Sequence, residues 1–142
     1  MKINTQFTVA VHTLLCIAYF SGSQKVTSDF IASSTNVNPV IIRKILGKLQ
    51  NAGFVETKAG VGGSFLAIPP QKITLKNIYS AVCDEEEDVR SVFNFHANPN
   101  PACPVGSKIH SVLDTPLANA QKAMEEELGK TTLADLLRKL EG

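Results

Sequence analysis

A glycine-rich stretch between two short β-prone runs constrains the fold of this 142-residue chain more than any other feature. The stretch reads "TKAGVGGSFLAIPP" from Thr57 to Pro70, with Gly60, Gly62 and Gly63 around a single valine. Glycines of this kind let backbone N–H groups approach phosphate oxygens in nucleotide-binding loops, and they also form the tips of β-hairpins. A tight hairpin can use glycine for purely structural reasons, although three glycines in four positions exceed what a turn needs. The neighbouring segments decide between these readings.

Three helices are predicted before this stretch. Apolar residues recur at three- and four-residue spacing over residues 5–21, which predicts a first helix. Its stripe consists of Phe7, Val11, Leu14, Leu15, Ala18 and Tyr19. Thr27 is placed to cap a short second helix that ends near residue 33 or 34. Asn38-Pro39 predicts the start of a third helix, because asparagine caps an N-terminus and proline suits the first helical position. Gly53 ends this helix as the residue after its C-cap.

The second half of the chain begins with the hairpin. Residues 54–57 and 64–68 predict its two strands, and the prolines at 69 and 70 end it. Thr74 caps a fourth helix that runs to about residue 83. Residues 84–103 contain the acidic run "DEEED" and two Asn-Pro steps, which predict loops.

Two further helices complete the prediction. A long helix is expected from about Pro104 to Leu128, with Pro116 as a candidate kink. A closing amphipathic helix follows, capped at Thr131 or Thr132. The order of elements predicts a mainly α fold with a small β-hairpin, a winged helix-turn-helix with a C-terminal extension. Three parts are expected: residues 1–83, a variable loop over 84–103, and the helices of 104–142. A phosphate cradle would need a helix directly after the glycines, and a second strand is predicted there instead.

Charge is distributed unevenly along the chain. Residues 1–76 hold eight Lys/Arg and two Asp/Glu, which gives a net charge of +6. Residues 77–142 hold six Lys/Arg and eleven Asp/Glu, which gives a net charge of −5. A basic lobe suits a polyanion such as DNA, although ordinary solvated surface charge remains the alternative. The chain has no apolar run long enough to span a membrane and no signal-peptide pattern, so a cytoplasmic protein is expected.

Basic side chains of the third helix are the first candidates for DNA contact. Arg43, Lys44 and Lys48 fall opposite its apolar stripe, and the third helix of this fold enters the major groove. Arg43 suits bidentate contact with guanine, whereas the two lysines suit phosphates. In the hairpin, a tip without β-carbons can approach the DNA backbone or the minor groove, with Lys58 supplying charge. The alternative is a basic solvent-facing helix that touches nothing.

The chain also resembles a known family. The segments "VTSDFIASSTNVNPVIIRKIL", "GKLQNAGFVETKAGVGGSFLA" and "PPQKITLKNIYSAV" are similar to the Rrf2 family of bacterial winged-helix transcription regulators, and to its YwnA-like members. The resemblance implies a homodimer, joined through the long helix, that represses or activates transcription at a partly palindromic double-stranded DNA operator. It places Asn38, Val40, Arg43 and Lys44 where the recognition helix meets the groove, and Lys58, Gly60, Gly62 and Gly63 at the tip of the wing. Thr27, Ser28 and Pro39, at the starts of the second and third helices, are further candidates for DNA contact.

Two departures from the family matter. Members often carry an arginine before the first wing glycine, where this chain has Ala59, so operator preference is expected to differ. Well-known members hold an iron–sulfur cluster on three closely spaced cysteines, and this loop offers only Cys103. Cys83, His96 and His110 are poor substitutes as cluster ligands. No metal and no cofactor are therefore expected.

Cys103 is a candidate thiol sensor because it precedes the expected N-terminus of the long helix, where the helix dipole favours thiolate. A half-buried cysteine without a regulatory role is the alternative. Cys16 is expected to pack in the core, and Cys83 could do either. No arrangement of the histidines suggests catalysis, and the acidic run is expected to be a solvated face.

These observations predict a sequence-specific DNA-binding regulator, a repressor by expectation, without catalytic activity and with an unknown effector. One rival is a winged-helix module that binds protein without direct DNA readout. The other is an enzyme that holds a nucleotide at the glycine turn.

Overall fold

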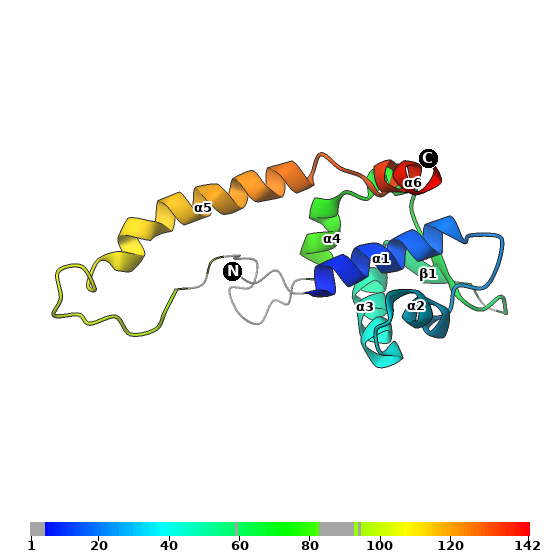
Figure 1. The fold of residues 1–142 in the computed structure, drawn as a ribbon, viewed down its shortest axis with the longest axis horizontal. Coiled ribbons are helices and arrows are strands. Elements are labelled where there is room, and N and C mark those ends of the chain that lie inside the picture. The colour runs from blue at the N-terminus through cyan, green and yellow to red at the C-terminus, as the bar shows by residue number, and fades with distance from the viewer. Residues whose placement is uncertain (1–4, 59, 83–92, 94) are drawn as a thin grey trace.

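The computed structural model describes residues 5–58, 60–82, 93 and 95–142, and its described part is mainly helical with one antiparallel hairpin (Figure 1). The elements follow in the order α1 (Thr5–Tyr19), α2 (Ser28–Thr35), α3 (Pro39–Asn51), β1 (Val55–Thr57), β2 (Ser64–Leu66), η1 (Pro70–Lys72), α4 (Leu75–Val82), α5 (Ile109–Leu128) and α6 (Leu133–Glu141). This order confirms the predicted winged helix-turn-helix. None of the described helices combines the length and apolar character that a bilayer span requires.

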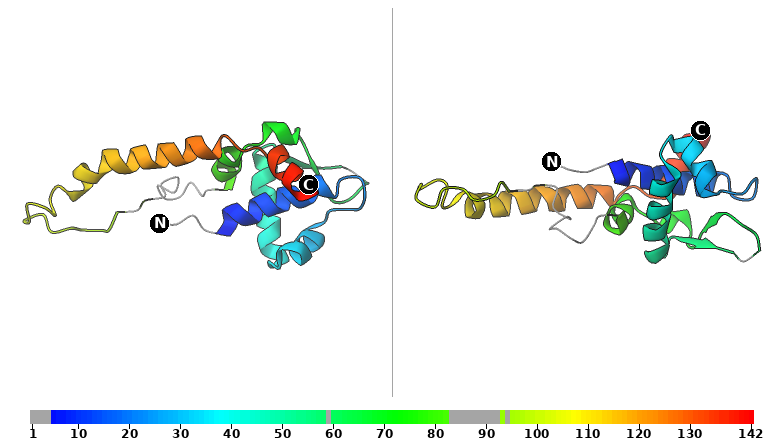
Figure 2. Two further views of the ribbon diagram at one scale, coloured as in Figure 1. Left: turned by 45° about the horizontal axis from the view of Figure 1, so that its top comes forward. Right: turned by 90° about the horizontal axis from the view of Figure 1, so that it is seen from below.

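The helices α1 to α4, the hairpin and α6 surround one apolar core, and α5 projects away from this body (Figures 1 and 2). The core contains Leu14, Ile17, Ile31, Ile42, Ile45, Leu49, Ile78 and Leu133, each at most 2% exposed. Leu133 brings α6 into this core, and two backbone hydrogen bonds hold it there. Leu133 N donates to Ile73 O at 2.8 Å, and Leu75 N donates to Thr131 O at 3.0 Å.

The buried face of α1 differs in part from the predicted stripe. Ala10, Thr13, Leu14 and Ile17 are at most 1% exposed, whereas Tyr19 is 49% exposed. The prediction was wrong for Tyr19, the last residue of α1, whose ring packs edge-on against Phe20 outside the buried core. The spacing of apolar residues located the helix but did not separate its buried face from a second, half-exposed apolar flank.

The predicted starts of α2 and α3 are confirmed by their capping hydrogen bonds. Thr27 Oγ1 accepts from Phe30 N at 3.1 Å, and Asn38 Oδ1 accepts from Val40 N at 2.8 Å. Each bond satisfies one N–H group of a first helical turn that has no partner within the helix. At the other end of α3, Gly53 has φ +85°, a conformation that glycine adopts without strain.

The long helix begins later than predicted. Residues 101–108 form turns, and α5 starts at Ile109 rather than Pro104. Ser107 N donates to Cys103 O at 2.9 Å within these turns, and Lys108 gives α5 no side-chain cap. Pro116 lies inside α5, whose helical run continues past it. The acidic run of residues 84–88 and Cys83 lie outside the described residues.

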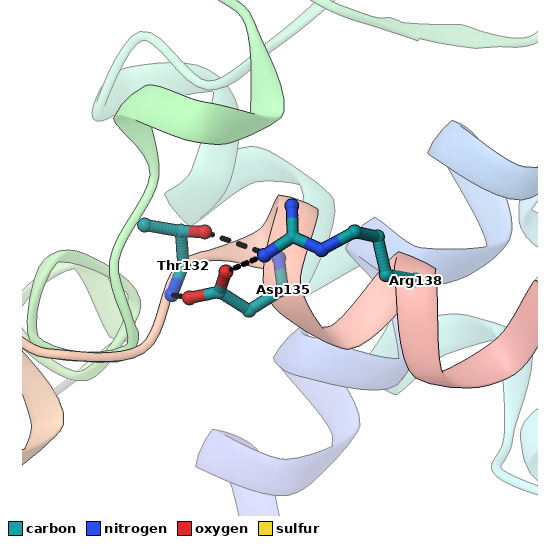
Figure 3. Close-up of polar contacts among 3 residues, drawn as sticks. All are labelled: Thr132, Asp135 and Arg138. Carbon is teal, nitrogen blue, oxygen red and sulfur yellow. Dashed lines mark hydrogen bonds and ion pairs between the residues drawn. The ribbon is translucent and has the colours of Figure 1, made fainter. Parts of the chain in front are cut away.

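The closing helix α6 begins with a reciprocal pair of hydrogen bonds (Figure 3). Asp135 N donates to Thr132 Oγ1 at 3.1 Å, and Thr132 N donates to Asp135 Oδ2 at 2.9 Å, while Arg138 also pairs with the Asp135 carboxylate. The cap predicted at Thr131 or Thr132 is therefore Thr132. The backbone N–H of Thr132 lowers the pKa of Asp135, with smaller contributions from the Thr132 hydroxyl and Arg138.

We expect this cap to contribute to stability in a pH-dependent way. Thr132→Ala should lower the free energy of unfolding by about 0.5–2 kcal/mol, whereas Thr131→Ala should not.

A lowered folded-state pKa of Asp135 stabilises the fold above the unfolded pKa of about 4, and this contribution is lost as the pH falls through the folded pKa. Urea unfolding should therefore show a cost of Asp135→Asn at pH 7 that shrinks at pH 3. An equal cost at both pH values would contradict this assignment.

Candidate nucleic-acid interface

The N-terminal half of α3 presents basic and apolar side chains to solvent. Arg43 and Lys44 are exposed, and Val40 and Ile41 are 51% and 45% exposed although both are large and apolar. Arg43 Nη1 also donates to Ser28 Oγ at 3.4 Å, which joins α3 to the first residue of α2. A guanidinium can contact guanine O6 and N7 together, and apolar side chains suit thymine methyl groups. This end of α3 has the chemistry needed to read base edges.

The helix caps beside these side chains set the position of the two helices. The side-chain oxygens of Thr27 and Asn38 accept hydrogen bonds from their own helices, and Pro39 occupies the first position of α3. Their main effect is to fix where α2 and α3 begin. The remaining N–H groups of a first helical turn can hold a phosphate, so this capping role is compatible with the predicted DNA contact of Thr27 and Ser28.

The hairpin is anchored to the segment that precedes α2. Val55 pairs with Leu66 and Thr57 with Ser64 in the ladder, and Ser64 N donates to Val26 O at 2.9 Å. A Cβ on Gly63 would lie 3.0 Å from Val26 N, and Gly63 has φ +78°, so only glycine fits there. Gly60 and Gly62 also have positive φ. The turn itself therefore needs all three glycines, and the interpretation that they exceed its needs was wrong.

Two lysines flank the hairpin tip. Lys58 Nζ lies 4.6 Å from the centroid of the Phe65 ring, a cation–π contact that holds the ammonium beside β2. The side chain of Lys25 lies beside Gly62, with its Cδ 3.5 Å from the point that a Cβ would occupy. Both lysines are exposed. Lys25 was absent from the sequence-based candidates because its contact with the hairpin joins residues far apart along the chain.

The four residues 25–28 connect the hairpin to α3. Lys25 and Val26 contact the hairpin, while Ser28 contacts Arg43. We name the exposed Lys25, Arg43, Lys44 and Lys58, together with the half-buried Ser28 between them, the basic surface. Its two ends are α3 and the wing, which lie at the opposite end of the molecule from the projecting part of α5 (Figures 1 and 2).

Lys48 does not belong to the basic surface. Its Nζ donates to Gln6 Oε1 of α1 at 3.1 Å and lies 3.5 Å from Val82 O at the end of α4. The side chain is half-buried because the last turn of α3 packs beside α1 and α4, and the carbonyl end of a helix favours a cation. The ammonium of Lys48 is therefore engaged within the protein and not directed at a phosphate, in contrast to the prediction.

Cys103 lies in the turns before α5, six positions ahead of the first helical residue. The backbone N–H groups of Gly106 and then Val105 hold the pKa of its thiol below the usual value. The predicted cause, the dipole of an adjacent helix, was wrong because the helix starts later. A Cβ on Gly106 would lie 2.6 Å from Asn100 O, so the turn that supplies these N–H groups requires glycine. Cys16, in contrast, is 4% exposed and packs in the core as expected.

Comparison with known proteins identifies the family. The model of the Rrf2 family, described as an iron-dependent transcriptional regulator, matches residues 3–139. This chain belongs to the Rrf2 family. It is 41% identical over 138 residues to YwnA of Bacillus subtilis (strain 168), whose name classes it among HTH-type transcriptional regulators; the match covers 97% of this chain and 98% of YwnA.

Solved structures show the same fold. A protein described as a transcriptional regulator from Lactobacillus plantarum is 27% identical, with a TM-score of 0.76 and coverage of 96% of this chain and 90% of that one. CymR of B. subtilis, the global cysteine regulator, is 23% identical, with a TM-score of 0.69 and coverage of 97% of both chains. The match to the Rrf2 family model and to YwnA makes this chain a transcription regulator and not an enzyme, as predicted.

The described residues of this Rrf2 chain do not fit the iron that the family description names. His110 Nε2 lies 3.3 Å from His96 O, and the two rings are 6.0 Å apart. Within the described part of the chain, no three His, Cys, Asp or Glu side chains gather as metal ligands. Cys16 is buried in α1 against Ser34 of α2, whereas Cys103 lies in the loop before α5. Cysteine ligation of a cluster would require thiolates that converge.

Proposed function

We propose that this Rrf2 regulator is a homodimeric, sequence-specific repressor. It places α3 in the major groove of a double-stranded operator and the wing against the adjacent backbone or minor groove. The observation that carries the proposal is the contact of residues 25–28 with both elements, since it gives the hairpin and α3 one common base. Such a protein works where the bacterial chromosome lies, in the cytoplasm.

Each side chain of the basic surface has a distinct proposed role. Arg43 reads a guanine, because its guanidinium can reach O6 and N7 together, and Val40 contacts a neighbouring base. Lys44, Lys58 and Lys25 neutralise phosphates, which gives affinity with little sequence information. Ser28 holds Arg43 in the free protein and turns to a phosphate in the complex. The bare tip at Gly60 and Gly62 lets the wing approach the sugar–phosphate backbone.

Dimerisation through α5 is supported by the exposure of the apolar side chains of this helix within a single chain. No side chain of α5 is buried within the chain, and Val112 is 62% exposed. Leu113, Leu117, Ala120 and Met124 recur at helical spacing along the projecting helix (Figure 1). Most of the stability of a helix in a protein comes from packing of its apolar face, so packing against a second copy supplies what this chain does not give α5.

Selection of bound fragments from the source genome tests this function. Purified protein should retain specific fragments in a mobility-shift assay, with an affinity that falls steeply as salt increases. Retention without specificity, or with no salt dependence, would favour the protein-binding module instead. Stabilisation against heat by ATP or another nucleotide would favour an enzyme.

The contribution of Lys25 can be measured separately. Lys25→Ala should weaken operator binding and reduce the slope of log K against log salt by about 0.9 for each phosphate contact removed. Lys139→Ala removes the same charge from exposed α6 and should leave the slope unchanged. Identical slopes for Lys25→Ala and the unmodified protein would remove Lys25 from the interface.

A thiol response is proposed to reside at Cys103. The lowered pKa increases the thiolate fraction, and thiolate is the form that reacts with oxidants. Hydrogen peroxide should weaken operator binding reversibly, and Cys103→Ser should remove this effect while Cys83→Ser retains it. Mass spectrometry of the oxidised protein locates the modified thiol. An oxidant effect that persists in Cys103→Ser would exclude Cys103 as its origin.

A further inference from the structure

A pocket of about 530 Å³ lies between α1, the end of α2 and the end of α6, and none of its lining residues belongs to the basic surface. Its walls combine the apolar side chains of Val11, Leu15, Tyr19 and Phe20 with the polar side chains of His12 and Ser34. The volume falls within the roughly 300–1,000 Å³ of small-molecule sites. The pocket uses the half-exposed apolar flank of α1, including Tyr19, and Leu140, which is 56% exposed.

Three polar side chains contact one another on one wall of this pocket. His12 Nε2 and Ser34 Oγ are 2.9 Å apart, and the Cys16 thiol donates to the same oxygen at 3.5 Å. A serine hydroxyl offers one donor and two acceptor positions, so these two contacts leave a third position for a ligand. The arrangement combines apolar walls with a few convergent polar atoms, as small-molecule sites do.

The lining restricts the charge of an occupant. Among the described residues that form it, none is Lys, Arg, Asp or Glu. A charged ligand would therefore lose hydration without gaining a partner of opposite charge. We propose that this pocket binds a small, neutral, aromatic or otherwise apolar molecule carrying one hydroxyl or carbonyl group. The polar group bonds to Ser34, and the apolar part packs against Leu15, Tyr19 and Phe20.

This site is connected to the DNA-binding helices. Ser34 lies in the last turn of α2, two residues before Asn36, whose φ of +57° turns the chain toward α3. A ligand bonded to Ser34 therefore contacts the helix that positions α3. The effect of the ligand on DNA affinity rests on the proposed function, whereas binding of the ligand to the pocket does not. Because the two are measured separately, failure of one is distinguishable from failure of the other.

Titration calorimetry with 2-naphthol and 4-phenylphenol tests the binding. Both should bind to the unmodified dimer, while the anionic naphthalene-2-sulfonate should not. Ser34→Ala removes one hydrogen bond and should weaken binding about three- to tenfold. Ser33→Ala is the matched control, because the Ser33 hydroxyl donates to Phe30 O of its own helix and should not matter. Leu15→Trp, with folding checked by circular dichroism, should fill the pocket and abolish binding.

Several results would overturn the proposal: no binding of either phenol, equal binding of the sulfonate, or equal effects of Ser33→Ala and Ser34→Ala. Conversion of the dimer to monomers by Leu15→Trp would also overturn it, because the pocket would then be the place where the partner subunit packs. Saturating 2-naphthol should change operator affinity by at least about fivefold in the unmodified protein, and not in Leu15→Trp. If 2-naphthol binds and no DNA is retained, the proposal of a ligand-binding pocket is supported and the proposed regulatory function is contradicted.

Discussion

Replacing Arg43 and Lys44 together by alanine is expected to abolish specific operator binding while the dimer remains intact. A bidentate arginine–guanine contact contributes about 1–3 kcal/mol of discrimination, so loss of Arg43 alone should lower specific affinity about 5- to 150-fold. Loss of Lys44 removes a phosphate contact in addition. Both side chains are exposed, so the substitutions should leave the fold unchanged. Mobility-shift titrations with operator and unrelated DNA measure the effect.

A matched control separates this effect from a general loss of positive charge. Lys130→Ala with Lys139→Ala removes two exposed charges from the end of the chain that does not carry the basic surface. It should change operator affinity little compared with the Arg43 and Lys44 pair. Unchanged operator affinity after loss of Arg43 and Lys44 would contradict the assignment of α3 as the recognition helix.

Placing aspartates on the apolar stripe of α5 is expected to separate the subunits. Leu113→Asp with Leu117→Asp would bury two carboxylates in a helix–helix contact, which is strongly unfavourable. Linking two binding modules raises overall affinity by about 10²–10⁴-fold, so monomers should bind the operator at least about 100-fold more weakly. Light scattering gives the oligomeric state, and the mobility shift gives the affinity.

The same charge on the other side of α5 serves as the control. Ser111→Asp with Thr115→Asp places two aspartates at the same four-residue spacing on exposed positions opposite the stripe. These variants should remain dimeric. Monomers from both pairs would indicate a general disruption of α5, and dimers from both would contradict dimerisation through this stripe.

Local signals predicted the elements of the fold well. Thr27, Asn38, Gly53 and Thr132 mark helix ends through hydrogen bonds or backbone angles that involve only neighbouring residues. The β-prone runs around the glycines likewise specify a hairpin through its turn. These features could be read from the sequence because each depends on a few consecutive side chains.

Contacts between distant segments could not be read in this way. Lys25 reaches the wing, and Lys48 reaches α1 and α4, only because the folded body brings these elements together. The start of α5 was misplaced because turns with their own hydrogen bonds compete with the helix around Cys103. That error also gave the wrong cause for the lowered pKa of this thiol.

The central claim is that α3 and the wing face the same stretch of DNA. Amide chemical-shift changes in an NMR titration with the operator duplex test it most directly. We predict large changes at residues 38–44 and 58–63 together with residues 25–28, and small changes along α6. Changes confined to α3 without the wing, or centred on α5 and α6, would contradict the account.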